Sequence, residues 1–167
     1  LKRNYKHPKA EIFADKILVK NFVQEKVSKD IIIPTLGIWE DANDIDFSTL
    51  KKPYILKTNH GSGMNLIINI HQNIEKKDTV KLLNKWLKLD YSYVTGEYQY
   101  KNIKRKILAE PLITDEKGNP LKDFKFFCFQ GKAKFIQVDF DRHASHKRNF
   151  YDLQWNRLDF TYLFPSS

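Results

Sequence analysis

The sequence has little cysteine and no long apolar run. Its single cysteine, Cys128, cannot form an internal disulfide, and the apolar surroundings in FKFFCFQ predict that the thiol packs as a small hydrophobic group. No apolar segment approaches the roughly 20 residues that a transmembrane helix needs. The first residues, LKRNYKHPKA, lack the apolar stretch of a signal peptide. These absences argue against a membrane-spanning or secreted protein and favour the cytoplasm.

Acidic residues are also comparatively few. The chain has 20 Asp and Glu against 29 Lys and Arg, a formal net charge of +9, which favours an anionic partner such as a nucleotide, a nucleic acid or an acidic glycan. Apolar residues make up 41% of the 167 residues, so a core can form, and the length suits about one domain. Because the chain opens without Met and stops at FPSS, we expect a fragment of a longer protein.

Periodic apolar residues predict two helices. Ala14 to Val27 shows near-helical spacing of apolar side chains. A second helix, capped by Asp78, carries one apolar stripe and places its lysines on the other side. That stripe consists of Val80, Leu83, Trp86 and Leu87.

Segments rich in β-branched and aromatic residues predict strands, and their order favours an α+β fold. The expected strands are 31–39, 53–57, 65–70, 106–113, 123–130 and 133–141. Pro34 limits the first of them to a sheet edge or to irregular structure. The last two should form an antiparallel hairpin with its turn at Gly131. Alternation along a strand then points Lys125 away from Cys128.

The segment YILKTNHGSG, which begins at Tyr54, reads as a strand that runs into a glycine loop. Glycine lets converging backbone N–H groups approach phosphate oxygens closely, and a lysine at the strand end adds positive charge. The candidate phosphate-binding residues are Lys57, Asn59, His60, Gly61, Ser62 and Gly63. An ordinary hairpin turn is the alternative, because the loop does not follow the P-loop pattern.

The order of these motifs resembles that of ATP-grasp enzymes. A helical ADK is followed by IPTLG, then LKTNHGSG, then LAEPLI, then a strand with DFK. More narrowly, KTNHGSG, QYKNI, DFKFFCFQGK, FIQVDFDR and RNFYDLQWN are similar to the TupA-like branch, which is associated with bacterial cell-surface polymers, including the teichuronopeptide type. The resemblance covers almost the whole chain, in order.

The resemblance implies an α+β ATP-grasp fragment with antiparallel sheets and flanking helices. It would lack the N-terminal lobe and the end of the C-terminal lobe. Residues 1–30 would close the first lobe and form a linking helix, residues 31–109 would form the nucleotide-clamping lobe, and residues 110–167 would hold the hinge and the first strands of the last lobe.

The resemblance also implies residues that hold ATP. Lys16 of ADK and Lys57 would be the two lysines directed at the phosphates, although a solvated helix lysine is the alternative for Lys16. Glu110 would open the hinge beside the adenine. The residues expected to line the adenine ring are Pro111, Leu112 and Ile113. The alternative is a strand end at which Pro111 merely stops the ladder.

The late strands carry the candidates for catalysis. By resemblance, Lys125 would steady the terminal phosphate or an acyl phosphate. The arginine fork suits carboxylate or phosphate, so Arg142 and Arg148 could hold an acidic substrate. Asp139 and Asp141 could approach Mg²⁺ or equally pair with neighbouring arginines, while the family's main metal ligands are expected beyond the C-terminus.

His143 and His146 are spaced like a metal-binding pair. A zinc site needs three or four ligands, and no Cys or third ligand cluster supports one here.

The function implied is the ATP-binding portion of a carboxylate–amine ligase of cell-surface polysaccharide or teichuronopeptide biosynthesis. ATP with Mg²⁺ would activate a carboxylate of an acidic sugar or peptide as an acyl phosphate, and an amino acid would displace the phosphate. No nucleic-acid partner is expected. Three alternatives stay open: a glycosyltransferase-type enzyme of polymer assembly, a basic nucleic-acid-binding domain using YSYVTGEYQYKNIKRK, and a fragment that binds ATP without catalysis.

Overall fold

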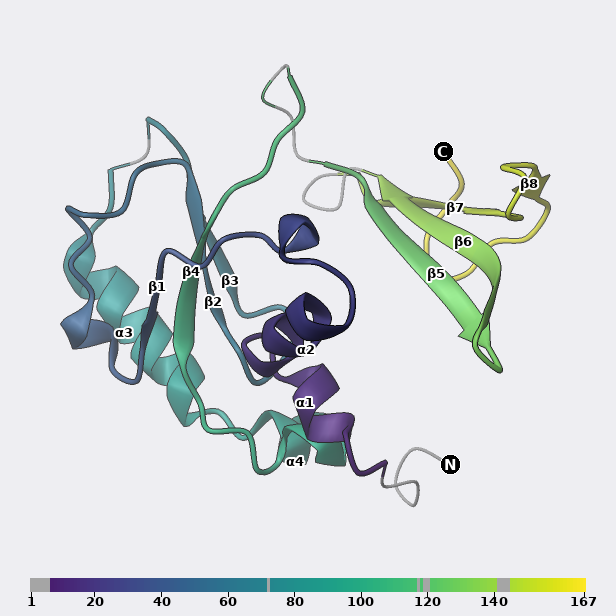
Figure 1. Ribbon diagram of the computed structural model, residues 1–167. Helices are drawn as coiled ribbons and strands as arrows, with labels where there is room; N and C mark the ends of the chain where they lie inside the picture. The colour runs from purple at the N-terminus through teal and green to yellow at the C-terminus, as the bar shows by residue number, and fades with distance from the viewer. Residues whose placement is uncertain (1–6, 72, 117, 119–120, 141–144) are drawn as a thin grey trace. The chain divides into compact units, whose positions relative to one another are not determined.

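The computed structural model describes residues 7–71, 73–116, 118, 121–140 and 145–167. The chain divides into two compact units, Leu1–Leu112 and Ile113–Ser167, each with a four-stranded antiparallel sheet (Figure 1). Helices together with antiparallel sheets confirm the predicted α+β class. The division expected from the resemblance, at residues 30/31 and 109/110, stays a prediction, as do the missing lobes.

The sheet of the first unit has the spatial order β1-β4-β2-β3. Its strands are β1 (Gly37–Trp39), β2 (Tyr54–Thr58), β3 (Asn65–Ile68) and β4 (Ile107–Pro111). β2 and β3 pair as the predicted hairpin. Of the strand expected over 31–39, only the last three residues pair, at the sheet edge. Lys29–Ile31 instead forms a 3-10 helix, η1, because the Ser28 hydroxyl accepts the Asp30 N–H at 3.1 Å.

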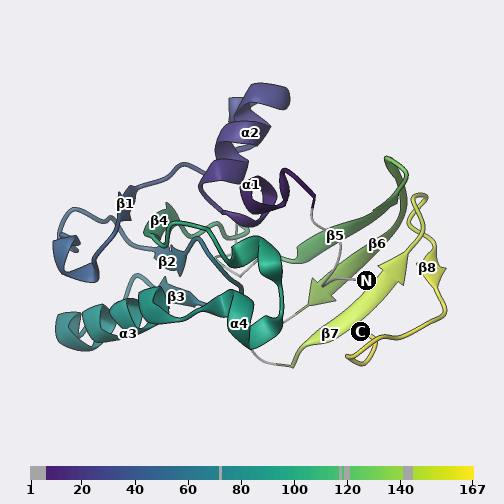
Figure 2. The same ribbon diagram turned by 90° about the horizontal axis from the view of Figure 1, so that it is seen from below.

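The helix α3 (Lys76–Lys88) covers one face of this sheet (Figure 2). It begins two residues before Asp78, which lies in the first turn rather than at the predicted cap. The predicted apolar stripe is confirmed: Leu83 is fully buried, and the other three members pack against the core as partly buried residues. The buried core comprises Ala42, Ile45, Leu50, Tyr54, Leu56, Ile68, Leu83, Ile107 and Ala109.

Two helices, α1 (Ala10–Ala14) and α2 (Leu18–Lys26), lie on the other side of the sheet (Figure 2). The single helix predicted over 14–27 is therefore wrong at its start. The chain breaks at Asp15, whose Oδ1 accepts the backbone N–H of Ile17 at 2.8 Å and begins the new helix. The remaining short helices of this unit are η2 (Ala42–Asp44), α4 (Tyr91–Thr95) and η3 (Tyr98–Tyr100).

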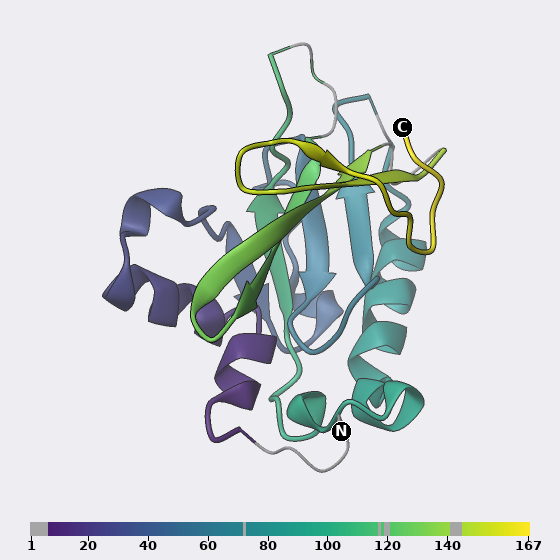
Figure 3. The same cartoon turned by 90° about the vertical axis from the view of Figure 1, so that its right-hand side faces the viewer.

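The sheet of the second unit has the order β5-β6-β7-β8. Its strands are β5 (Asp123–Phe129), β6 (Lys132–Phe140), β7 (Lys147–Tyr151) and β8 (Arg157–Leu158). β5 and β6 form the long hairpin predicted from the sequence (Figure 3), and its turn uses a positive φ of 74° at Gly131. Aromatic rings stack in this unit, Phe127 of β5 on Phe135 of β6 at 4.4 Å and Phe150 of β7 on Phe160, just after β8, at 4.3 Å between centroids.

Cys128 is exposed, so the expectation that its thiol packs inside is wrong. It lies near the end of the edge strand β5, beside a register shift between Phe127 and Cys128, and the neighbouring Phe126 and Phe129 are exposed as well. Across the described residues, no helix has the length and apolar character that crossing a membrane requires.

Candidate functional site

The glycine loop joins β2 to β3 and has a buried base and an exposed tip. Gly61 is buried, and a Cβ there would lie 2.5 Å from Cε of Met64 and 2.8 Å from Cδ2 of Tyr91, so only glycine fits. Ser62 and Gly63 are exposed, and Gly63 has a φ of 80°, which glycine adopts without strain. The backbone of the tip is therefore accessible to a ligand.

Asn59 anchors the base of this loop. It is fully buried, and its Nδ2 donates to Oδ2 of Asp15 and to the backbone oxygen of Lys104, both at 3.0 Å. Its Oδ1 accepts the N–H of Lys106 at 2.7 Å. Both donors of the amide are thus engaged, which gives Asn59 a positioning role. Direct contact of Asn59 with a phosphate stays a prediction.

Lys16 reaches the loop from the segment between α1 and α2. Its Nζ donates to the backbone oxygen of Thr58 at 3.0 Å and also to that of Gly61. Burial, and then the nearby charge of Lys57, lower the pKa of Lys16 to about 8, although Asp15 and Glu110 act in the opposite direction. Lys16 is therefore not the solvated helix lysine of the alternative interpretation, because it contacts the predicted loop.

The lowered pKa of Lys16 predicts opposite effects of pH on stability and on anion binding. Between pH 8 and the ordinary lysine pKa of 10.5, the unfolded chain holds a proton that folded Lys16 has released, so the free energy of unfolding should rise with pH. Affinity for inorganic triphosphate should instead fall about tenfold from pH 7 to pH 9 as the ammonium is lost. Calorimetric titration across this range measures the affinity.

A Lys16→Arg variant serves as the matched control for this prediction, because arginine stays charged over the whole range. Its triphosphate affinity should change little between pH 7 and pH 9. An equal loss of affinity in both proteins would exclude Lys16 as the titrating group.

Lys57 and Glu110 form the second part of the cluster. Glu110 on β4 is paired with Ile55 on β2, and paired residues have their side chains on the same sheet face. Lys57 is two residues after Ile55, so its side chain shares that face with Glu110, away from α3. Its carboxylate makes ion pairs with both Lys57 and Lys20, and its side chain is only 4% exposed. Burial by itself raises the pKa of Glu110, but the two lysines outweigh it and hold that pKa below its usual value.

Lys20 belongs to this cluster but was not predicted from the sequence. Its Nζ also donates to the backbone oxygen of Ile33 at 2.8 Å and to Oγ1 of Thr35 at 2.9 Å. It follows Lys16 by four residues, the spacing that places side chains on one helix face, and this signal was available in ADKILVK.

His60 lies inside the first unit, not at the exposed tip. It is 1% exposed, and its Nε2 lies 3.2 Å from the backbone oxygen of Leu89. Burial, and then the charge of Arg105, lower its pKa, which favours the neutral imidazole at pH 7. The structure gives His60 a packing role between the loop and the end of α3, and its phosphate contact stays a prediction.

The expected hinge follows directly from β4. The strand ends at Pro111, and the next residue still bonds across to the segment before β2, since the Leu112 N–H donates to the backbone oxygen of Pro53 at 3.1 Å. Ile113 is 45% exposed and begins the second unit. The structure places Glu110 with the lysines, and contacts of these residues with an adenine ring stay a prediction.

The second unit holds a separate ionic cluster centred on Asp139. The carboxylate is 1% exposed and accepts from Nε of Arg148 at 2.6 Å, Nζ of Lys125 at 2.9 Å and Nε2 of Gln137 at 2.9 Å. Lys125 also pairs with Asp123. Burial opposes ionisation, but these partners outweigh it and hold the pKa of Asp139 far below its usual range.

The pairing of Asp139 with Arg148 is one of the two alternatives that the sequence left open. His146 lies 3.1 Å from the same carboxylate and stacks on Phe164 with ring centroids 3.7 Å apart. Asp141, Arg142 and His143 lie outside the described residues. Among the residues that are described, no three His, Cys, Asp or Glu side chains gather as a metal site would require. The catalytic roles of Lys125, Arg142 and Arg148 stay predictions.

Comparison with protein families shows which family the chain resembles. A family model described as TupA-like ATPgrasp matches residues 1–166, which is essentially the whole chain. No match was found among curated proteins or among solved structures.

Proposed function

The chain belongs to the TupA-like ATP-grasp family, and we propose that its first unit binds the phosphates of ATP at Lys16, Lys57 and the exposed tip of the glycine loop. One observation carries this proposal: two segments far apart in the sequence bring their lysines to the same loop. Lys16 contacts the loop carbonyls directly, and Lys57 lies at the end of the strand that leads into it. Such a cluster of ammonium groups favours a polyanion.

The lysines would change partners when phosphate binds. In the structure, Lys16 donates to the carbonyls of Thr58 and Gly61, and Lys57 pairs with Glu110. Phosphate oxygens are stronger acceptors for ammonium groups than neutral carbonyls. We therefore expect Lys16 to exchange a carbonyl for a phosphate oxygen. The backbone N–H groups of Ser62 and Gly63 would donate further hydrogen bonds to the phosphate oxygens.

The proposed reaction is that of a carboxylate–amine ligase. A substrate carboxylate oxygen would attack the terminal phosphorus of ATP, the bond to the ADP oxygen would break, and an acyl phosphate would form. An amine nitrogen would then attack the acyl carbon and expel phosphate, with loss of a proton from nitrogen. The lysines would offset phosphate charge throughout, so positioning and electrostatics would carry the catalysis. No side-chain nucleophile is required.

Magnesium is expected from the family, but the described residues do not provide a site for it. The two most buried acidic groups near the predicted machinery, Glu110 and Asp139, are each already paired with two basic side chains. If Mg²⁺ enters with the nucleotide, it need not have a preformed protein site, since Mg²⁺ is commonly held by one or two carboxylates together with substrate phosphates.

The substrates of this proposal rest on the family resemblance alone. They would be a carboxylate of an acidic sugar or peptide and an amino acid, joined in the cytoplasm as part of cell-surface polysaccharide or teichuronopeptide synthesis.

The test is thermal denaturation with and without Mg-ATP. At a hundredfold excess over the dissociation constant, ATP should raise the melting temperature of the first unit by about 10–12 °C. Lys57→Ala should abolish the shift while keeping the fold, because Lys20 still pairs with Glu110. Lys81→Ala, which removes an exposed lysine on α3, is the matched control and should keep the shift. Equal shifts in the two variants would contradict the proposed site.

The same assay separates the alternatives. Stabilisation and hydrolysis of a nucleotide sugar in place of ATP would favour glycosyl transfer. Tight, salt-sensitive binding of oligonucleotides without an effect of ATP would favour a nucleic-acid-binding domain.

A further inference from the structure

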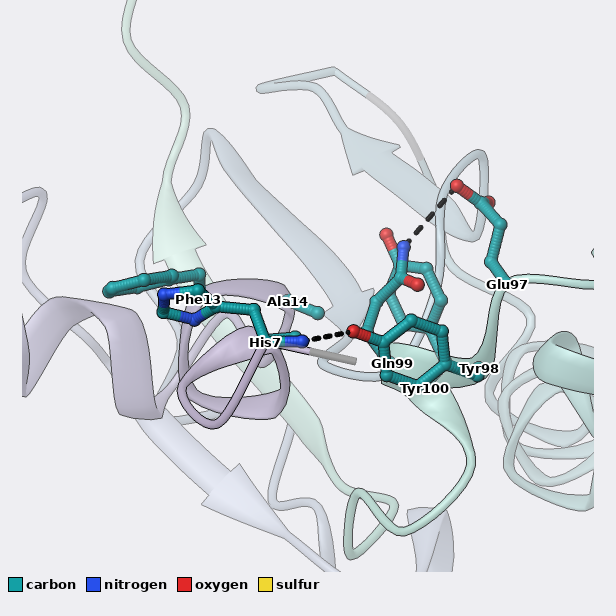
Figure 4. Close-up of a pocket in the computed structure, with 8 residues that line it drawn as sticks. His7, Phe13, Ala14, Glu97, Tyr98, Gln99 and Tyr100 are labelled. Carbon is teal, nitrogen blue, oxygen red and sulfur yellow. Dashed lines mark hydrogen bonds between the residues drawn. The ribbon is translucent and has the colours of Figure 1, made fainter. Parts of the chain in front are cut away.

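A pocket lies between α1 and the 3-10 helix η3, within the first unit and outside the lysine cluster. Its volume is about 540 Å³, within the range of small-molecule sites. Phe13 and Ala14 on α1, together with His7, form one wall, and Tyr98 and Tyr100 on η3 form the other (Figure 4). Segments more than 80 residues apart meet here, since the backbone N–H of His7 donates to the Tyr98 hydroxyl at 2.8 Å. The pocket is therefore a product of the fold.

The chemistry of the lining is unusual for this chain. Four aromatic rings line the pocket, the imidazole of His7 and the rings of Phe13, Tyr98 and Tyr100, and Glu97 supplies a carboxylate. The rings of His7 and Phe13 lie 6.1 Å apart between centroids. The chain has 29 Lys and Arg residues, yet none of the lining residues that the structure describes is one of them. By contrast, Lys20 and Lys29 line a second pocket of about 490 Å³ on this unit.

The negative charge of the pocket is that of Glu97, and a neighbouring side chain donates to it. Nε2 of Gln99 donates to Oε1 of Glu97 at 3.4 Å, which orients the carboxylate (Figure 4). Burial, and then the negative charge of Glu97, raise the pKa of the Tyr100 hydroxyl. The charge of the carboxylate therefore acts on a group that lines the pocket. The ring of Tyr100 is itself held edge-on by Tyr91 at 5.0 Å.

We propose that this pocket binds an organic ammonium group, with the aromatic faces and the Glu97 carboxylate as its partners. Aromatic faces carry negative electrostatic potential and attract cations, and quaternary ammonium ligands are recognised in this way. The Glu97 carboxylate lies at the edge of the pocket beside Gln99, on the side away from Phe13 (Figure 4), and adds a full opposite charge in a partly buried place. The site is separate from the proposed nucleotide site, and its ligand binds without a requirement for ATP.

A ligand in this pocket would also affect the glycine loop, through the chain segments that form the pocket walls. The α1 wall leads directly into Asp15, and the η3 wall leads into Lys104 and Lys106. All three residues hold the side chain of Asn59 at the base of the loop. A ligand that fixes α1 against η3 should therefore stabilise the segments that position Asn59.

The experiment compares choline with its neutral isostere 3,3-dimethylbutan-1-ol, using the 167-residue chain without nucleotide. Ligand-observed NMR titrations give both dissociation constants, with sodium chloride added so that ionic strength is constant. We expect choline to bind about tenfold or more tightly than the alcohol. Glu97→Gln and Phe13→Leu should each weaken choline binding about three- to tenfold. Tyr93→Ala, at a ring that is 88% exposed and outside the pocket, should leave it unchanged.

Equal affinity for the two probes would overturn the proposal, because a merely apolar pocket does not distinguish them. So would choline binding that neither Glu97→Gln nor Phe13→Leu weakens, or the absence of saturable choline binding. The probe comparison uses the unaltered chain, so it decides the question even if a variant fails to fold. If Mg-ATP causes no shift in melting temperature but choline still binds, the nucleotide proposal is rejected and the proposal for this pocket stands.

Discussion

Replacing Asn59 with alanine should lower the free energy of unfolding of the first unit by about 3–6 kcal/mol. The substitution removes three hydrogen bonds, one buried and two partly buried, and leaves Oδ2 of Asp15, a residue only 5% exposed, without the Asn59 side-chain donor. The backbone groups of Lys104 and Lys106 lose their partner at the same time. An unsatisfied buried polar group costs about 1–3 kcal/mol, and more when it is charged.

Urea denaturation followed by tryptophan fluorescence measures this effect. Trp39 and Trp86 pack against the core of the first unit and Trp155 lies in the second, so replacing Trp155 with phenylalanine leaves a fluorescence signal from the first unit alone. The control is Asn65→Ala, which changes the same residue type at an exposed position on β3 and should shift stability by less than about 0.5 kcal/mol. A similarly small change for Asn59→Ala would show that the loop does not depend on this anchor.

The loss of Asn59 should also affect the proposed function. The N–H of Lys16 donates to the Asn59 backbone oxygen at 3.3 Å, and Asp15 adjoins Lys16, so the substitution loosens the segment that carries the lysine. The melting-temperature shift caused by Mg-ATP should then shrink even under conditions in which the variant is folded. An unchanged shift would mean that Lys16 is positioned independently of Asn59.

Replacing Asp139 with asparagine should destabilise the second unit by about 3–5 kcal/mol, the usual effect of removing one partner from a buried ion pair. Asparagine keeps the size of the side chain but leaves Arg148, itself 8% exposed, without its counter-charge. Lys125 keeps Asp123 as a partner, so the loss falls mainly on Arg148. Fluorescence of Trp155 during urea denaturation reports the unit concerned.

The effect of Asp139→Asn should depend on pH in a defined direction. The pKa of Asp139 is lowered in the folded state, so its stabilising contribution is complete above the ordinary aspartate pKa. As the pH falls below about 4, the unfolded chain takes up a proton that folded Asp139 does not, and the contribution declines. The difference between the original chain and the variant should therefore be full at pH 7 and smaller at pH 3.

Asp159→Asn is the matched control in the same unit, because this carboxylate is exposed. It should change stability by less than about 0.5 kcal/mol and show no comparable dependence on pH. If Asp139→Asn behaves like Asp159→Asn, the cluster of Asp139, Arg148 and Lys125 does not hold the second unit together.

Local patterns in the sequence were sufficient for much of the fold. The α3 stripe, the hairpin of β2 and β3 and the hairpin of β5 and β6 all depend on periodicity and turn residues within a few positions of one another. Predictions failed where a side chain changed the backbone locally. The Asp15 carboxylate begins a new helix inside a continuous apolar pattern, and the Ser28 hydroxyl starts a 3-10 turn within an apparent strand.

The family is established from the sequence alone, and the glycine loop with Lys16 and Lys57 is predicted from it, because these signals are short motifs in a fixed order. Only the tertiary structure decided what each charged group contacts. Lys16 meets a loop 45 residues away, and Asn59 bonds to Asp15 at a separation of 44. The partners of Glu110 and Asp139 come from neighbouring strands or a facing helix. Such contacts follow from strand register and packing, which no local motif encodes.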